Sequence, residues 1–138
     1  MPEKTLSDLS QRMREIDIAM LCTHTEGGAI AARPMSNNGD VGRDGRSVYF
    51  THGGTRTIHD IEANPQVSLT FQGPKHFAVT VEGKAELVRD KSAFHAHWTP
   101  ELDHWFDQGI DTPGIVMIRV DATRVHYWDG LEQGEITP

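Results

Sequence analysis

Apolar residues near the start of the chain repeat with the period of an α-helix. They lie three or four positions apart, with polar residues between them, at Leu6, Leu9, Met13 and Ile16. Thr5 and Asp8 have the spacing of a capping box, which satisfies two backbone N–H groups at a helix start. The pattern therefore predicts an N-terminal helix over about residues 5–16.

Beyond residue 16 the hydrophobic pattern changes to short apolar-rich runs, which are typical of β-strands. The first two runs are separated by Glu26-Gly27-Gly28 and predict an antiparallel hairpin. Gly83 interrupts a later alternating run, so we expect a bulge or a sharp bend there. The expected strands cover residues 17–24, 29–36, 46–51, 66–71, 77–89, 115–120 and 125–128.

Polar and glycine-rich segments complete the predicted layout. Residues 37–45 predict a loop, and residues 57–63 predict a short helix that ends at an Asn-Pro pair. Residues 91–106 predict a further helix, interrupted at Thr99-Pro100. Five to seven mostly antiparallel strands with three short helices indicate a mainly β fold, a small barrel with helical decoration, in a single domain over residues 1–138.

Composition narrows the class of protein. The 138 residues carry a formal net charge of -7, which argues against a nucleic-acid partner because phosphate backbones select basic surfaces. No apolar run approaches the roughly 20 residues that cross a bilayer, so no membrane partner is expected. Cys22 is the only cysteine, which excludes an internal disulfide and suits a reducing compartment. We therefore expect a soluble, cytoplasmic protein.

The most informative chemistry lies between residues 32 and 57. Two expected strands pass through this segment, and the second continues by way of Gly53-Gly54 into Thr55-Arg56-Thr57 at a helix start. Backbone N–H groups, hydroxyls and a guanidinium meet at that point, and this combination suits a phosphate group. The segment therefore predicts a site for a phosphorylated cofactor.

Less specific interpretations of the same residues stay open. Arg33 precedes Pro34, and because proline is confined to sheet edges and bulges, Arg33 could simply be an exposed edge residue. Thr57 and Asp60 have capping-box spacing, so the turn before them could be only a helix cap.

The histidines and aromatic residues of residues 91–106 are expected to have structural roles rather than to bind a metal. On a helix, His95 and His97 would point about 200° apart, so no metal site is predicted there. Trp98, Trp105 and Phe106 are expected in the core or at a dimer interface, with the wall of a cofactor groove as the alternative.

Several short segments occur in a characteristic order along most of the chain. They are Ala32-Arg33-Pro34-Met35, Tyr49-Phe50-Thr51, Thr55-Arg56-Thr57, Asn64-Pro65, Val81-Glu82-Gly83-Lys84-Ala85 and Tyr127-Trp128-Asp129. Over about residues 5–130 this order resembles the pyridoxamine 5'-phosphate oxidase-like family, and within it the general stress protein type of FMN-binding split barrel. The resemblance implies a six-stranded antiparallel split barrel that forms a homodimer, with FMN in grooves at the subunit interface.

The resemblance also implies which residues contact FMN. The strand residues beside the isoalloxazine ring would be Arg33, Pro34, Met35 and Ser36, with Arg33 able to reach the phosphate or the ring carbonyls. Phe50 and Thr51 would line the ring and the ribityl chain. The phosphate would be held by Thr55, Arg56 and Thr57.

One position departs from the family pattern. The family has lysine where this chain has Thr57, so Arg56 or Arg33 would have to supply the missing positive charge. No catalytic residue can be assigned from the sequence. The resemblance implies an FMN-dependent oxidoreductase linked to stress, in which the flavin carries the redox chemistry. The alternatives are a non-enzymatic flavin carrier or sensor, and a split barrel for haem or a deazaflavin, where haem would need an axial histidine.

Overall fold

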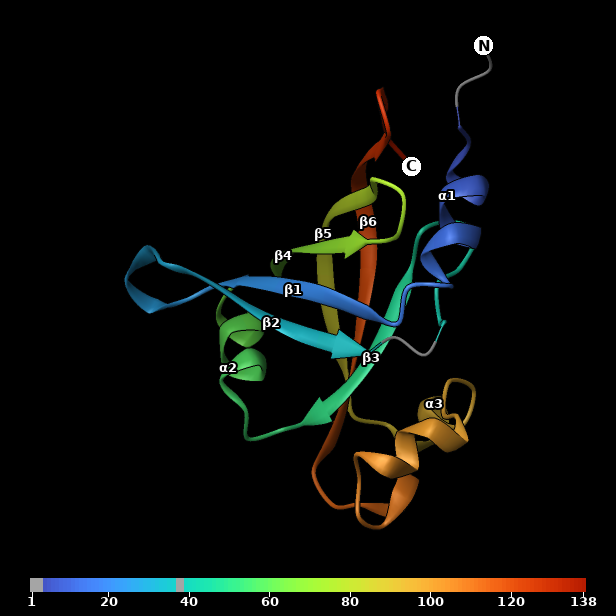
Figure 1. Cartoon of the computed structure of the whole chain (residues 1–138). Helices are drawn as coiled ribbons and strands as arrows, with labels where there is room; N and C mark the ends of the chain where they lie inside the picture. Colours follow the sequence, from blue (N-terminus) through green and yellow to red (C-terminus); the bar gives the residue numbers. More distant parts are fainter. Residues whose placement is uncertain (1–3, 37–38) are drawn as a thin grey trace.

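The structure is a computed structural model that describes residues 4–36 and 39–138 (Figure 1). In chain order its elements are α1 (Leu6–Met13), β1 (Ile18–His24), η1 (Glu26–Gly28), β2 (Ile30–Ser36), β3 (Ser47–His52), α2 (Arg56–Ala63), β4 (Gln66–Gln72), β5 (Phe77–Val88), α3 (Lys91–Phe94), η2 (Pro100–His104), η3 (Gly109–Asp111), β6 (Ile115–Asp129) and β7 (Glu132–Ile136), where η marks a 3₁₀ helix.

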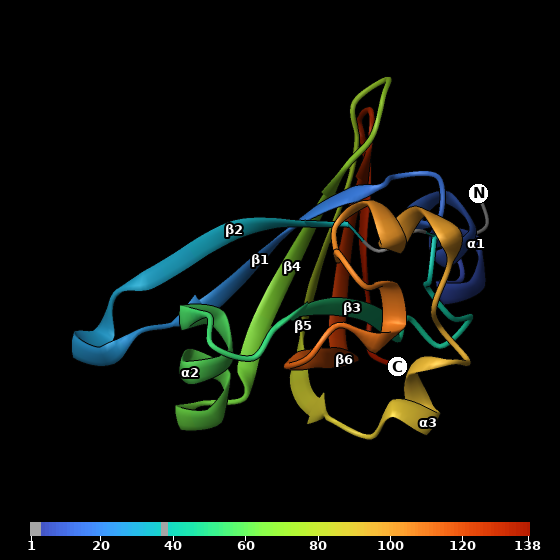
Figure 2. The ribbon, with the colours of Figure 1, turned by 90° about the horizontal axis from the view of Figure 1, so that it is seen from below.

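One antiparallel sheet contains all the strands, in the order β2-β1-β4-β5-β6-β3, and β7 pairs with β6 outside this path. The sheet curls so that its two edge strands, β2 and β3, approach each other across the opening of a half-barrel (Figures 1 and 2). The mainly β, six-stranded antiparallel split barrel expected from the sequence is therefore confirmed, and β7 is an addition to it.

Helix α1 begins where the sequence predicts. The Asp8 backbone N–H donates to Thr5 Oγ1 over 3.1 Å, and the Thr5 backbone N–H donates to Asp8 Oδ2 over 2.9 Å, which confirms the capping box. The helix ends at Met13, three residues before the predicted end near residue 16. Leu9 and Met13 are fully buried in the barrel core. The apolar face of α1 thus closes one end of the barrel.

The bend expected at Gly83 is also present. The pairing of β5 with β6 shifts register between Glu82 and Gly83, which marks a bulge. A Cβ atom on Gly83 would overlap the carbonyl oxygen of Asp121 on β6. Glycine is needed here because the two backbones approach too closely for a side chain.

Two predictions in the second half of the chain are wrong. Residues 91–106 do not form a helix interrupted only at Pro100, because α3 ends at Phe94 and 3₁₀ helices follow it. The final strand is not divided at residues 121–123, since β6 runs without a break and stays paired with β5 beyond the bulge. The polar segment of β7 gave no strand signal, and its Gly134 packs directly against the Tyr127 ring.

Residues 89–114, which we call the helical excursion, leave the sheet between β5 and β6 and pack beside β3 (Figure 2). Its aromatic residues form a second core with β3. The Phe50 ring lies edge-on to Phe94 and Trp98, with ring centroids 5.4 and 5.0 Å apart. Trp98 is partly buried and packs against this second core, one of the two positions expected for it, and the excursion is fixed to one side of the barrel opening.

The expected loop over residues 37–45 includes Asn37 and Asn38, which lie outside the described residues. In its described part, Val41 forms an isolated antiparallel bridge with Ser47, the first residue of β3. In the described part of the chain, helices are too short or too polar to pass through a bilayer.

Candidate small-molecule site

A cavity of about 350 Å³ lies between the two edge strands and the helical excursion, and we call it the edge-strand cavity. Its wall is formed by Pro34, Met35 and Ser36 of β2, by Phe50, Thr51 and His52 of β3, and by Ile18, Leu102, Trp105 and Phe106. Small-molecule sites are commonly cavities of about 300–1,000 Å³ with mainly apolar walls and a few polar groups. The edge-strand cavity has this character and lies where the barrel opens.

Five residues predicted from the sequence meet in this cavity. Pro34, Met35 and Ser36 arrive from one edge strand, and Phe50 and Thr51 from the other. No third strand among the described residues covers the open side of β2 or of β3. An edge position also suits Pro34, because proline has no N–H to donate to a ladder. A flat ligand placed here would meet side chains and open backbone groups together.

Other cavity residues were only partly anticipated. Trp105 and Phe106 line the wall, so the groove-wall alternative applies to them, although Phe106 is also buried in the second core. Ile18 was missed, yet it lies opposite Ser36 in the β1–β2 register, and this pairing is the signal that could have placed it. His52 enters because it continues β3 by one residue past Thr51.

Arg33 does not line the edge-strand cavity. Its Nη1 donates to Thr23 Oγ1 over 2.8 Å, and its Nη2 lies 3.6 Å from Asp60 Oδ2. The Thr23 hydroxyl in turn donates to the same carboxylate oxygen over 2.9 Å. Asp60 is only 2% exposed, so the charge of Arg33 is compensated by a buried acid of the protein itself.

This network excludes the capping interpretation of Thr57 and Asp60. Helix α2 begins at Arg56 with Thr55 as its N-cap residue, and Asp60 turns toward Thr23 instead of the helix start. Thr57, at the second helical position, is 7% exposed and faces the interior. The helix itself was predicted correctly, including its end at Asn64.

The start of α2 keeps polar groups that an anion could use. Arg56 is exposed and makes no ion pair or side-chain hydrogen bond within residues 4–36 and 39–138. The hydroxyl oxygen of Thr55 is buried without a hydrogen-bond partner in the same ranges. Residues 55–57 do not line the edge-strand cavity, but they follow His52, which does, after only two glycines. Backbone N–H groups at a helix start attract anions.

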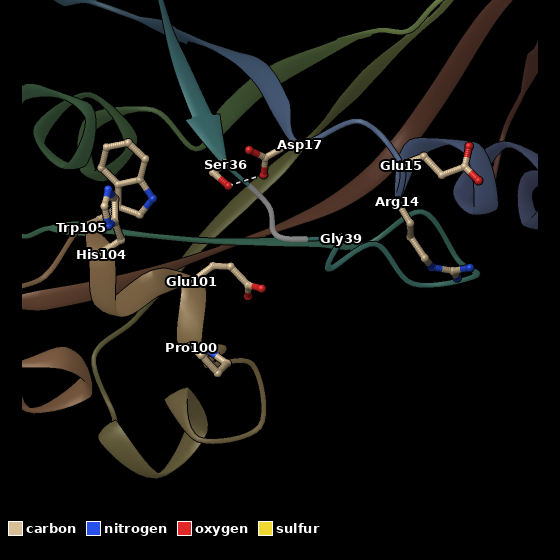
Figure 3. A pocket seen from close by; sticks show the side chains of 9 residues that line it. All are labelled: Arg14, Glu15, Asp17, Ser36, Gly39, Pro100, Glu101, His104 and Trp105. Atoms are coloured by element: carbon tan, nitrogen blue, oxygen red, sulfur yellow. Dashed lines mark hydrogen bonds between the residues drawn. The ribbon is translucent and has the colours of Figure 1, made fainter.

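A second cavity, of about 710 Å³, adjoins the first and shares Ser36 and Trp105 with it. Figure 3 shows its walls, which come from the α1–β1 connection, the end of β2 and η2. The remaining wall residues are Arg14, Glu15, Asp17, Gly39, Pro100, Glu101 and His104. We call this the acidic cavity because three of its side chains are carboxylates.

Among the described residues, no three histidine, cysteine, aspartate or glutamate side chains lie together in a way that could hold a metal ion. His95 follows α3 directly and is exposed, while His97 Nδ1 lies 2.6 Å from Asp40 Oδ2. The two histidines therefore do not converge, although the α-helix on which the sequence argument relied ends before them.

The curled antiparallel half-barrel places the chain in the class of split-barrel proteins. Residues 4–137 match the family model described as "Pyridoxamine 5'-phosphate oxidase like", and the chain belongs to this family. The suspected family is thereby confirmed.

Known proteins are similar to the chain in structure and in sequence. A solved structure of a protein related to general stress protein 26, from Clostridium acetobutylicum, superposes with a TM-score of 0.84 at 21% identity, covering 99% of this chain and 96% of the other. A heme binding protein from Mycobacterium smegmatis superposes at 0.75 with 16% identity, covering 99% and 60%. The protein bli-3 of Neurospora crassa is 22% identical over 91% of this chain, which spans 65% of that relative's length.

Proposed function

We propose that the protein binds FMN in the edge-strand cavity and acts as a flavin-dependent oxidoreductase. The observation that carries this proposal is the meeting of Pro34, Met35 and Ser36 with Phe50 and Thr51 in one cavity, since these are the residues that the family resemblance assigns to the flavin ring and ribityl chain. When bound, the flavin would supply the hydride and electron chemistry.

The residues present fit such a cofactor. Apolar side chains and open strand edges suit a flat heterocycle with polar edges. The unpartnered Thr55 hydroxyl and the exposed Arg56 guanidinium suit the phosphate, two glycines beyond the cavity. Arg33 is the member of the expected set that fits least, because Thr23 and Asp60 already engage its guanidinium.

The proposed assembly is a homodimer, and the outer face of the sheet supports it. Met20 and His126 lie in one row across β1, β4, β5 and β6, and the His126 ring stacks on Trp128 with centroids 4.0 Å apart. Met20 and Trp128 are each 37% exposed, and Ile18 on the same strand as Met20 is 46% exposed. A second copy would cover these side chains, whereas the Trp98 side chain packs inside its own chain.

The visible spectrum of the purified protein, followed by titration with FMN, tests the cofactor. We expect flavin absorption bands, binding of one FMN per chain, and a dimer in sedimentation equilibrium at micromolar concentration. Oxidation of NADH or NADPH by the FMN-loaded protein then separates an oxidoreductase from a flavin carrier or sensor. A monomer that binds neither FMN nor riboflavin would overturn the proposal.

Haem is the second candidate, and one observation supports it besides the haem-binding structural neighbour. His52 lines the edge-strand cavity and could supply the axial ligand that haem iron requires. A Soret band that disappears in His52→Ala would select haem over flavin. With either cofactor we expect the protein in the cytoplasm, where the single thiol of Cys22 stays reduced.

A further inference from the structure

The acidic cavity opens beside the edge-strand cavity, and Ser36 is the residue expected to contact FMN that also lines it. Among the residues that the structure describes, Ser36 and Trp105 belong to both cavities. Its volume of about 710 Å³ is within the range that accommodates a complete small molecule. A compound bound there would lie against the same tryptophan and the same end of β2 as a ligand in the edge-strand cavity.

The charged residues around the acidic cavity determine whether it favours a positively or a negatively charged ligand. Among the described wall residues, Glu15, Asp17 and Glu101 supply three carboxylates, and Arg14 supplies one permanent positive charge. The Arg14 side chain is engaged elsewhere, since its Nε donates to the Val41 carbonyl over 2.6 Å. Three carboxylates against one guanidinium make the formal charge of this part of the wall negative. Anions, phosphate esters among them, are disfavoured by such a wall.

An aromatic surface accompanies the carboxylates. The indole of Trp105 is 64% exposed, and the His104 ring stands edge-on to it with centroids 5.5 Å apart. Figure 3 shows both rings at one end of the cavity, His104 as the last residue of η2 and Trp105 directly after it, with Glu101 one turn earlier in η2. An exposed indole binds flat cations through stacking and cation–π attraction.

We propose that the acidic cavity binds an organic cation with a flat ring, such as an N-alkylated nitrogen heterocycle. Its placement as the second reactant beside the cofactor rests on the proposed function, whereas the binding itself does not. Trp105 would contact the ring of the cation, and Glu101, which Figure 3 shows at the same end of the cavity, would balance its charge. The Asp17 carboxylate already accepts a hydrogen bond from the Ser36 hydroxyl.

Three pyridine compounds of nearly equal shape test the charge preference: 1-methylnicotinamide as the cation, nicotinamide as the neutral form and nicotinate as the anion. Calorimetric titration of the full chain without FMN should give the tightest binding for 1-methylnicotinamide, at least about threefold tighter than nicotinamide. Its advantage should shrink with added salt. Binding of nicotinate as tight as that of 1-methylnicotinamide would overturn the proposal, as would absence of binding of the cation.

Two variants localise the site, with a third as the control. Glu101→Gln should weaken 1-methylnicotinamide binding about two- to fivefold and leave nicotinamide and FMN unchanged, because Glu101 lines only the acidic cavity. Trp105→Ala should weaken the cation and nicotinamide together. Glu62→Gln, which removes an equal charge from α2 outside both cavities, should have no effect. An equal loss in Glu101→Gln and Glu62→Gln would contradict the assignment.

The two proposals fail separately in this design. If the cation binds as described while FMN does not bind, the acidic cavity stands and the flavin assignment falls. If FMN binds while the preference for the cation is absent, with or without saturating FMN, only the inference on the acidic cavity is overturned.

Discussion

Arg33 on β2 and Asp60 on α2 form a partly buried ion pair that the Thr23 hydroxyl joins from β1. Arg33 Nη2 lies 3.6 Å from Asp60 Oδ2, and Thr23 accepts a hydrogen bond from Arg33 while donating one to Asp60. The cation expected to reach FMN is thus part of the connection between α2 and the sheet. The charge left for a phosphate at the start of α2 is that of Arg56.

We predict that Arg33→Ala destabilises the fold by about 2–3 kcal/mol, because it leaves the carboxylate of Asp60 buried without its cation. The free energy of unfolding in urea measures this loss. Asp60→Asn combined with Arg33→Ala should recover part of it, as expected for two coupled residues.

Flavin titrations with the same variant distinguish a structural role from a ligand contact. We expect FMN and riboflavin, which lacks the phosphate, to respond equally to Arg33→Ala. A loss confined to FMN would show instead that Arg33 leaves Asp60 to bind the phosphate.

Arg56→Ala is predicted to weaken FMN binding by roughly 1.5–3 kcal/mol through loss of a charge-assisted hydrogen bond to the phosphate. Riboflavin should bind as before, and the unfolding free energy should change by less than about 0.5 kcal/mol, because Arg56 is exposed and unpaired within the described residues. Lys84→Ala removes an exposed cation outside both cavities and serves as the control. Equal FMN affinities of wild type and Arg56→Ala would rule out the phosphate contact.

The parts of the candidate site that depend on local sequence could be predicted. Pro34 indicated an edge strand and the two glycines after His52 indicated a turn into a helix, so the two sides of the cavity could be expected. The partner of Arg33 could not, because Asp60 reaches it only through the packing of α2 on β1. The same applies to the acidic cavity, whose wall joins segments more than 80 residues apart, such as Asp17 and Glu101.

Gly83→Ala is predicted to destabilise the protein by about 1–3 kcal/mol, since the new Cβ would overlap the Asp121 carbonyl and force β5 away from β6. Thermal unfolding monitored by circular dichroism measures the effect. Gly54→Ala is the matched control, because its Cβ would meet no atom within 4 Å. Equal melting temperatures for the two variants would show that the bulge accommodates a side chain.

The helical excursion shows where the fold could not be predicted from the sequence. Residues 91–106 have aromatic residues at nearly helical spacing, with polar residues between them. In the structure they do not share one helix, and Phe94 and Phe106 reach the second core beside β3 from separate short segments. Tertiary packing on Phe50 thus overrides the local helical signal. In β7, Gly134 fits against Tyr127 although the segment has no apolar alternation, so pairing with β6 decides its conformation.

Asp129 should make the stability of the fold depend on pH in acid. A hydrogen bond from Lys4 and a second from Arg12 hold the pKa of Asp129 below its ordinary value. A depressed carboxyl pKa stabilises the folded state above pH 4 and loses this effect as the pH falls through the folded value. The unfolding free energies of wild type and Asp129→Asn should therefore differ at pH 6 and converge below pH 4. Lys4→Met should reduce the difference, and a constant gap down to pH 2 would contradict the linkage.

Thr57→Lys introduces the positive charge that the family resemblance leads us to expect at this position. Thr57 is 7% exposed at the second position of α2, so a lysine must extend its stem along the protein to bring its ammonium group to solvent at the helix start. We predict about tenfold tighter FMN binding, an effect that salt reduces and that riboflavin does not show, because the added charge acts only on the phosphate. Thr57→Met matches the length of the new side chain without its charge and should leave FMN affinity unchanged. If Thr57→Met tightens FMN as much as Thr57→Lys, packing at α2 and not charge controls the cofactor, and if neither does, Arg56 alone satisfies the phosphate.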